Sequence, residues 1–160
     1  MLTMKLNTHS PDWAQRIFFA VLILTTFIKL WLAVAIPLTG DEALFYKWGQ
    51  HLDWGYYDHP PMGGWLLWLM QSISPALIVL RLPAVLLWIA VTAGMMDLFR
   101  RMQTEKTDQV WWLGSLFLLL PFTWALTLVT TDTPLIFFLF FSAYAFLRAE
   151  MEGRYTWVAL

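Results

Sequence analysis

The chain has 160 residues, of which 59% are hydrophobic, 18% aromatic and 13% charged. Soluble domains carry roughly 25% charged residues, so a soluble fold is close to excluded, and the aromatic content excludes a disordered chain. The net charge of −1 argues against nucleic acid as the main partner, and the lack of cysteine excludes thiolate metal sites and a cysteine nucleophile. The remaining class is an integral membrane protein.

Four apolar segments predict transmembrane helices. They are residues 17–38, which hold the single charge Lys29, and residues 76–99, 110–131 and 133–148. A bilayer core about 30 Å thick needs about 20 apolar residues in a helix, and these segments approach that length. The sequence therefore predicts an all-α membrane protein with about four transmembrane helices.

The segment 39–75 between the first two spans is predicted to be an outer loop. Its second part belongs to an apolar run, residues 62–80, that is rich in tryptophan and is interrupted by glycine at 63 and 64, serine at 72 and 74 and proline at 75. Only Arg81 separates the apolar stretch 62–80 from the next apolar stretch. If both stretches crossed the membrane, almost no residues would remain for the turn between them. Because tryptophan prefers the headgroup level, we expect residues 62–74 to form an interfacial or re-entrant helix.

The distribution of basic residues predicts the orientation. Lysine and arginine number two in the N-terminal lead, one in residues 40–61, three in residues 100–106, none near Asp132 and two after residue 147. Loops rich in lysine and arginine stay in the cytoplasm. We therefore expect a cytoplasmic N-terminus, with the outer loop and Asp132 on the opposite side of the membrane.

Asp41 and Glu42 begin the outer loop, directly after Thr39 and Gly40. A threonine followed three residues later by glutamate is a capping box, and acids suit a helix N-terminus. The spacing favours capping. Alternatively, the two carboxylates at the outer membrane face accept a proton or bind a metal, and both interpretations hold together if the cap fixes the neighbouring carboxylate.

Asp58 and His59 precede two prolines, Pro60 and Pro61. Proline forces the residue before it into an extended conformation, so this segment is stiff. A carboxylate next to an imidazole suits a divalent metal or a phosphate. A rigid turn lying on the membrane surface explains the same residues equally well.

Three further charged residues have both a structural and a functional interpretation. Lys29 lies inside a span, which suggests function, although we favour a side chain that snorkels to the outer interface. Arg81 is expected at the outer face, where it anchors the helix or binds a lipid phosphate through its fork of N–H groups. Asp132 caps the last span ahead of Pro134, or converges with Asp41 on the same side.

Four short motifs, in this order, resemble the N-terminal part of a polyprenyl-phosphate-sugar-dependent glycosyltransferase of the GT-C class. They are Asp41-Glu42-Ala43 with the aromatic residues behind it, Gly55-Tyr56-Tyr57-Asp58-His59-Pro60-Pro61-Met62, Arg81-Leu82-Pro83-Ala84, and Thr131-Asp132-Thr133-Pro134-Leu135. The chain is similar to bacterial proteins related to protein O-mannosyltransferases and to the aminoarabinose transferase that modifies lipid A. The resemblance covers residues 17–148 approximately.

The resemblance implies roles for individual residues. Asp41 corresponds to the acid that activates or orients the acceptor, with Glu42 and Asp132 as support. Asp58 lies where a relative has a metal-binding glutamate, so a divalent ion is an expected cofactor.

His59 lies where that relative has a lysine near the carrier phosphate. Leu44 stands where it has an arginine, so the resemblance leaves that phosphate contact to another group, for which Lys47 is the candidate beside His59 and Arg81.

The resulting hypothesis is a membrane glycosyltransferase that moves a sugar from a polyprenyl-phosphate carrier to a glycan, lipid or protein acceptor on the outer face of a bacterial inner membrane. The alternative is a small non-catalytic membrane subunit or carrier-type protein whose outer loop binds a partner. The chain ends inside another apolar run, residues 157–160, and members of this class are several times longer. We therefore expect an N-terminal module of a longer enzyme that is inactive alone.

Overall fold

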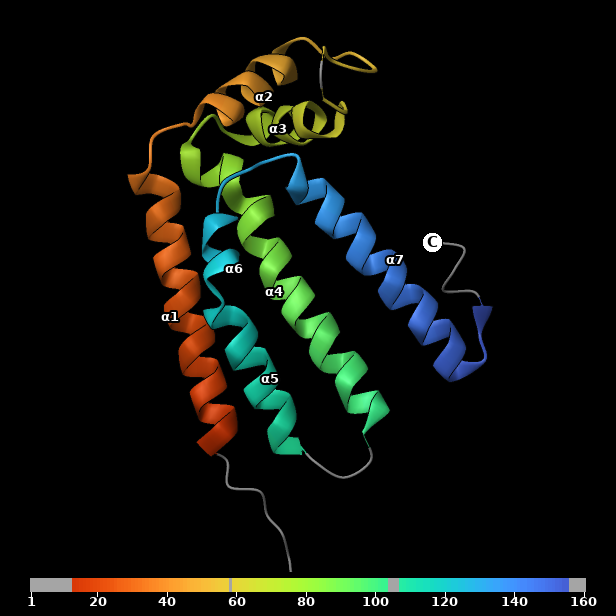
Figure 1. Ribbon diagram of the computed structural model, residues 1–160. Helices are drawn as coiled ribbons and strands as arrows, with labels where there is room; N and C mark the ends of the chain where they lie inside the picture. Colours follow the sequence, from red (N-terminus) through yellow and green to blue (C-terminus); the bar gives the residue numbers. More distant parts are fainter. Residues whose placement is uncertain (1–12, 58, 104–106, 156–160) are drawn as a thin grey trace, which may run out of the picture.

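The computed structural model describes residues 13–57, 59–103 and 107–155. Figure 1 shows two groups of helices: one group runs lengthwise, and a pair lies across one end of it. We call the crossing pair the outer layer; it consists of α2 and α3. The helices are α1 (Trp13–Ala35), α2 (Gly40–Gln50), α3 (Met62–Ile73), α4 (Leu77–Met102), α5 (Thr107–Leu119), α6 (Pro121–Ala125) and α7 (Asp132–Glu152).

Three helices, α1, α4 and α7, are long and apolar enough to cross a membrane. The prediction of an all-α membrane protein is confirmed, because the described residues form helices joined by loops. The observed bounds differ from the expected ones at their ends. The helix α1 begins and ends earlier than the predicted span 17–38, and α4 and α7 continue beyond residues 99 and 148.

The expected third span, 110–131, is not one continuous helix. Helix α5 ends at Leu119 and α6 covers only Pro121–Ala125. Proline lacks the N–H that continues a helix, and its ring clashes with the preceding turn, so Pro121 breaks the segment. The hydroxyl of Thr123 lies 3.1 and 2.8 Å from the carbonyl oxygens of Leu118 and Leu120, and its single proton is shared between these two acceptors near the break.

Helices α2 and α3 approach each other closely. A Cβ atom added to Gly49 of α2 would lie 2.9 Å from the backbone nitrogen of Trp68 and 3.1 Å from the carbonyl oxygen of Gly64. Glycine is therefore required at this contact. The predicted interfacial helix 62–74 is present as α3, and Gly63-Gly64, which we expected to interrupt it, instead lie buried in its first turn.

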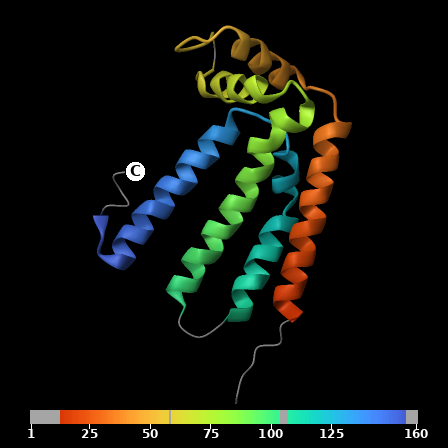
Figure 2. The same cartoon turned by 180° about the vertical axis from the view of Figure 1, so that it is seen from behind.

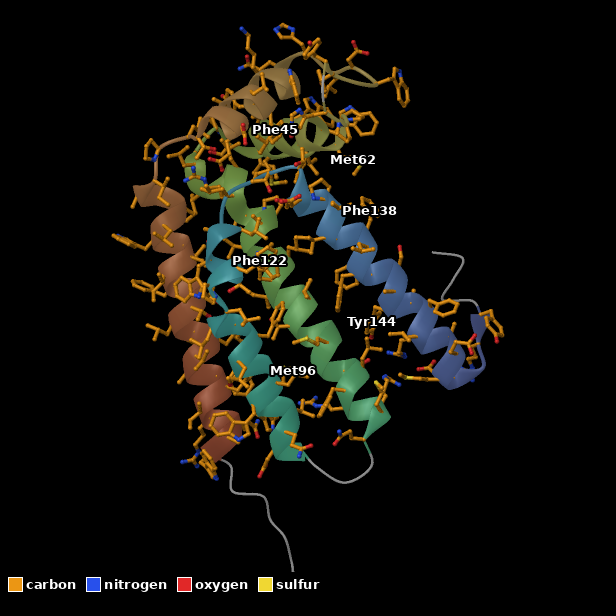
Figure 3. The ribbon with its side chains drawn as sticks, viewed as in Figure 1. Phe45, Met62, Met96, Phe122, Phe138 and Tyr144 are labelled. Atoms are coloured by element: carbon orange, nitrogen blue, oxygen red, sulfur yellow. The ribbon has the colours of Figure 1, made fainter. Side chains whose placement is uncertain are left out.

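Buried apolar side chains form two separate clusters, one near each end of the molecule. Figure 3 labels one member of each, Phe45 and Met96, and places them far apart. The cluster beneath the outer layer contains Phe45, Leu67, Leu80, Ala84 and Val129. The cluster at the opposite end contains Phe18, Met96, Val110 and Leu118. The first cluster attaches α2 and α3 to α4, and thus positions the outer layer on the spans.

Helix α7 stands apart from the helices around α1 and α5, and it packs mainly on α4 (Figures 1 and 2). At the end away from the outer layer, Asp97 of α4 holds it by polar contacts. Its Oδ2 accepts hydrogen bonds from the Tyr144 hydroxyl at 2.8 Å and from Arg148 at 3.0 Å. Arg101 bonds the same oxygen at 2.8 Å and reaches Glu152 at 3.0 Å. This network fixes the splayed helix to its neighbour.

Candidate active site

The outer layer begins with the predicted capping box. The Thr39 hydroxyl accepts from the backbone N–H of Glu42, and the Glu42 carboxylate accepts from the backbone N–H of Thr39 at 3.2 Å. Glu42 is buried, whereas Asp41 is exposed in the same first turn. The two adjacent acids therefore have different surroundings. The carboxylate of Glu42 is used for contacts inside the protein, whereas the carboxylate of Asp41 is accessible at the surface.

Glu42 forms a buried ion pair with Arg81 of α4. The exposed fractions of the two residues are 1% and 0%. The Arg81 Nε donates to Glu42 Oε1 at 2.8 Å, and its Nη2 donates to Oε2 at 2.6 Å. This two-point contact is the strong form of an arginine–carboxylate bond. It joins the outer layer directly to a membrane span.

The remaining N–H groups of Arg81 are also occupied. Nη1 donates to the carbonyls of Ala33 and Ile36 at 3.0 and 2.7 Å, and Nη2 donates to that of Pro37 at 3.0 Å. An arginine side chain has five N–H donors, and these contacts together with those to Glu42 use them all. Arg81 therefore connects the C-terminal end of α1 to α4 by hydrogen bonds. Neither the expected surface anchor nor the expected phosphate contact matches this buried side chain.

Glu42 also connects to the chain segment ahead of α7. Its Oε1 accepts from the backbone N–H of Val129 at 3.1 Å. That residue lies three positions before Asp132, which is exposed at the start of α7. Asp41 and Asp132 therefore belong to segments joined through Glu42, and both segments lie at the same end of the molecule (Figure 1).

The ion pair predicts a dependence of stability on pH. Burial alone raises the pKa of Glu42, but the hydrogen bonds from Arg81, Thr39 and Val129 hold it below the ordinary value of 4.5. A lowered pKa stabilises the fold above the unfolded-state value, and this contribution is lost as the pH falls through the folded-state value. We expect the free energy of unfolding in detergent to decrease below about pH 4.5.

The variant Glu42→Gln supplies the control for this titration. It retains a side-chain oxygen for the N–H of Val129 but carries no group that titrates in acid. The loss of stability in acid should be smaller in this variant than in the original chain. Identical acid profiles for the two proteins would contradict the assignment.

The other predicted phosphate ligands lie in the outer layer and the loop after it. Lys47 is exposed in the last turn of α2, about 120° around the helix from Asp41 at 3.6 residues per turn. His59 is partly buried, with its ring 5.8 Å from that of Phe45 and 5.7 Å from that of Trp48. The predicted metal ligand Asp58 lies outside the described residues.

An aromatic stack stiffens the loop between α2 and α3. The rings of Trp48 and Tyr56 lie 4.3 Å apart with an interplanar angle of 3°. The Tyr56 hydroxyl donates to the carbonyls of Trp48 and His51, each at 3.0 Å. Because His59 also contacts Trp48, the stack holds the imidazole against α2.

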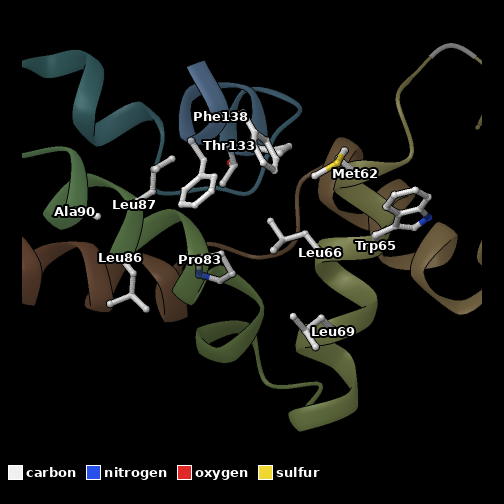
Figure 4. Close-up of a pocket in the computed structure, with 12 residues that line it drawn as sticks. Met62, Trp65, Leu66, Leu69, Pro83, Leu86, Leu87, Ala90, Thr133 and Phe138 are labelled. Carbon is white, nitrogen blue, oxygen red and sulfur yellow. The ribbon is translucent and has the colours of Figure 1, made fainter. Parts of the chain in front are cut away.

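A cavity of about 500 Å³ lies between α3, α4 and α7. Figure 4 shows Leu66 and Leu69 of α3 on one side, Pro83 of α4 on the other, and Phe138 of α7 above. We call this cavity the apolar groove. Its lining is almost wholly hydrocarbon, with the Thr133 hydroxyl as an exception. It lies where α3 of the outer layer meets α4 and α7.

Lys29 occupies an unexpected position. It is only 2% exposed, so the preferred interpretation, a side chain snorkelling to the interface, is wrong. Its ammonium group donates to the carbonyl of Thr123 and to the Thr127 hydroxyl, the latter at 3.4 Å. It also lies 5.9 Å from the ring centroid of Trp88. Lys29 thus holds the interrupted segment after Pro121 against α1 and α4.

The comparisons with known proteins identify the family. A sequence model of the family described as dolichyl-phosphate-mannose-protein mannosyltransferase matches residues 58–160. The chain belongs to this family. Members are glycosyltransferases of GT-C type, which agrees with the resemblance carried by the four motifs. Asp41, Glu42 and Lys47 precede the matched residues.

One relative supports the same assignment. The chain is 34% identical over 103 residues to the lipid A galacturonosyltransferase RgtD of Rhizobium johnstonii, an alignment that covers 62% of this chain and 21% of that protein. The chain thus spans about a fifth of the length of this family relative. No solved structure matches the chain.

Proposed function

We propose that this family member forms the outer-face part of a glycosyltransferase that moves a sugar from a polyprenyl-phosphate carrier to an acceptor outside a bacterial inner membrane. One observation carries the proposal: an exposed acid, Asp41, and the exposed cationic side chain of Lys47 lie on α2 of the outer layer, whose other helix, α3, forms one wall of an apolar groove. A lipid-linked donor needs such a combination, because its chain stays in hydrocarbon while its phosphate and sugar lie at the interface.

In the proposed reaction, an acceptor oxygen forms a bond to the anomeric carbon while the bond from that carbon to the carrier phosphate breaks. The phosphate leaves with the electron pair. Asp41 orients the acceptor hydroxyl and accepts its proton as a general base. His59 and Lys47 stabilise the negative charge on the departing phosphate. Asp132 supports the acceptor side from the start of α7.

Glu42 contributes indirectly to this site. It holds the first turn of α2 through Thr39 and fastens it to Arg81, and thereby fixes the direction of the neighbouring Asp41. We therefore assign Glu42 and Arg81 a positioning role, in place of a contact with the donor. A divalent ion at Asp58 remains a proposal. Among the described residues no group of three or more histidine or acidic side chains forms a metal cluster, and the steps above use only protein side chains.

The apolar groove gives a test of the lipid-linked donor. Ala90 of α4 lines the groove, and Ala90→Trp places a large ring inside it. We expect this variant to raise the KM for a polyprenyl-phosphate-sugar donor at least about tenfold, since each lost CH₂ contact of the chain weakens binding by about 0.8 kcal/mol. The kcat should change much less, because the groove lies away from the reacting carbon.

Ala93→Trp is the matched control. Ala93 lies about one turn further along α4 and lines a different crevice, between α1, α4 and α5. It receives the same ring on the same helix, so it should leave the KM for the donor unchanged. Equal KM values for the original chain and Ala90→Trp would remove the groove from the donor site.

A second candidate function, a subunit that binds a partner through the outer loop, is favoured by one observation. The loop after α2 exposes 85% of Trp54 and the whole of Tyr57. Large exposed aromatic side chains are typical of binding surfaces. If this chain only binds a partner, replacement of Asp41 by asparagine leaves the activity of the assembled complex unchanged. If the chain is catalytic, the same replacement strongly lowers the rate of sugar transfer, so the Asp41→Asn variant separates the two functions.

A further inference from the structure

A narrow crevice of about 260 Å³ opens between α1, α4 and α5, at the end away from the outer layer. We call it the inner crevice. Its walls are apolar over most of their length, and a cationic side chain, Arg100, lies at its mouth. The crevice is lined by Phe18, Leu22, Ala93, Met96, Arg100 and Trp111, among others.

Arg100 differs from the arginine beside it. Arg101 pairs with Asp97 and with Glu152 on the side of α4 that faces α7. Arg100 is exposed, and its guanidinium group lies 4.8 Å from the ring centroid of Trp111. Within the described part of the chain it makes no ion pair. Its charge is therefore available at the mouth of an apolar crevice.

A second cationic side chain lies at this end of the molecule. Arg16 is exposed in the first turn of α1 at the same end. Among the described acids near the crevice, Asp97 is bound to Arg101 and Arg148, and Asp108 lies in the first turn of α5, one turn before Trp111. Basic pockets between transmembrane helices attract anionic headgroups, at about 1 kcal/mol for each cationic side chain near the surface.

We propose that the inner crevice binds an anionic phospholipid, with an acyl chain between Phe18, Ala93 and Trp111 and its phosphate on Arg100. The apolar walls suit a hydrocarbon chain, and the positive charge of Arg100 selects an anionic headgroup over a zwitterionic one. Arg100 is held ready for this contact, because its stacking on Trp111 restricts the side chain before any lipid arrives. This lipid is separate from the proposed donor, whose groove lies between α3, α4 and α7.

The test measures retained lipid directly, by native mass spectrometry of the complete gene product in detergent. Phosphatidylglycerol and phosphatidylcholine with matched chains are added in equal amounts. We expect the original protein to retain phosphatidylglycerol in about fivefold preference, which is the ratio that 1 kcal/mol supplies. Arg100→Gln should abolish this preference, and Arg154→Gln, an exposed arginine outside the crevice, should keep it.

A second variant tests the crevice itself. Ala93→Trp fills the apolar part and leaves Arg100 in place, so it should reduce the amount of either lipid retained. Equal retention of both lipids by the original protein would overturn the proposal, as would an unchanged preference in Arg100→Gln. Lipid retention that survives Ala93→Trp would place the bound lipid elsewhere on the protein. Circular dichroism of each variant confirms that the helices form.

Discussion

Replacement of Asp41 by asparagine is expected to lower the rate of sugar transfer by about 10²–10⁴-fold, the contribution of a general base. Asparagine has nearly the same size and still accepts hydrogen bonds, but it cannot take the proton of the acceptor hydroxyl. Asp41 is exposed and lies outside the buried contacts of Glu42, so the helix should form normally. The rate is measured with the complete gene product and a polyprenyl-phosphate sugar.

The matched control is Asp53→Asn. Asp53 is another exposed acid of the outer loop, and among the described residues its side chain accepts a hydrogen bond only from the next residue, Trp54, at 2.7 Å. This variant removes the same charge at the same end of the protein, and its rate should stay within a factor of about two, because surface substitutions have small effects. Sugar transfer at the original rate in Asp41→Asn would refute the catalytic assignment.

The largest effect on stability is expected at the buried ion pair. Arg81→Met removes the cation and leaves the Glu42 carboxylate buried with its partner gone. Breaking a buried pair in this way costs about 3–5 kcal/mol. The carbonyls of Ala33, Ile36 and Pro37 lose their donors in addition. The free energy of unfolding in detergent micelles measures the loss.

A double variant separates the charge from the packing. In Glu42→Gln with Arg81→Met no uncompensated charge remains, and the amide still accepts from the N–H of Val129. We expect the double variant to be more stable than Arg81→Met alone. Arg101→Met, whose side chain is 37% exposed, is the control for losing an arginine at a surface pair, at about 1 kcal/mol or less. A similar loss in Arg81→Met and Arg101→Met would contradict the buried role.

The hydropathy of the sequence located α1, α4 and α7 because a membrane span is a local property of about 20 residues. The capping box at Thr39 and Glu42 was equally local and is confirmed. The break at Pro121 was missed because the run of uncharged residues continues across it. A signal was present, since a proline inside a helix usually ends or bends it.

The partners of Arg81 and Lys29 could not be read from the sequence. Arg81 and Glu42 are 39 residues apart, and Lys29 and Thr123 are 94 apart, so their contacts exist only after the helices pack. One general signal was available: a charged side chain in an apolar stretch is rarely left unpaired. It indicates that a partner exists but does not select which acid or carbonyl supplies it.

The bond between Glu42 and Arg81 determines how deep Asp41 lies in the membrane interface. Arg81 belongs to α4, and Glu42 is adjacent to Asp41, so the depth of Asp41 in the interface follows that span. If α2 were held only by its contact with headgroups, its height would change with the thickness of the bilayer. Here the protein itself sets the height of the acid relative to α4, so the phosphate of the proposed donor has to reach that height, and a bilayer of different thickness has to adjust locally around the protein.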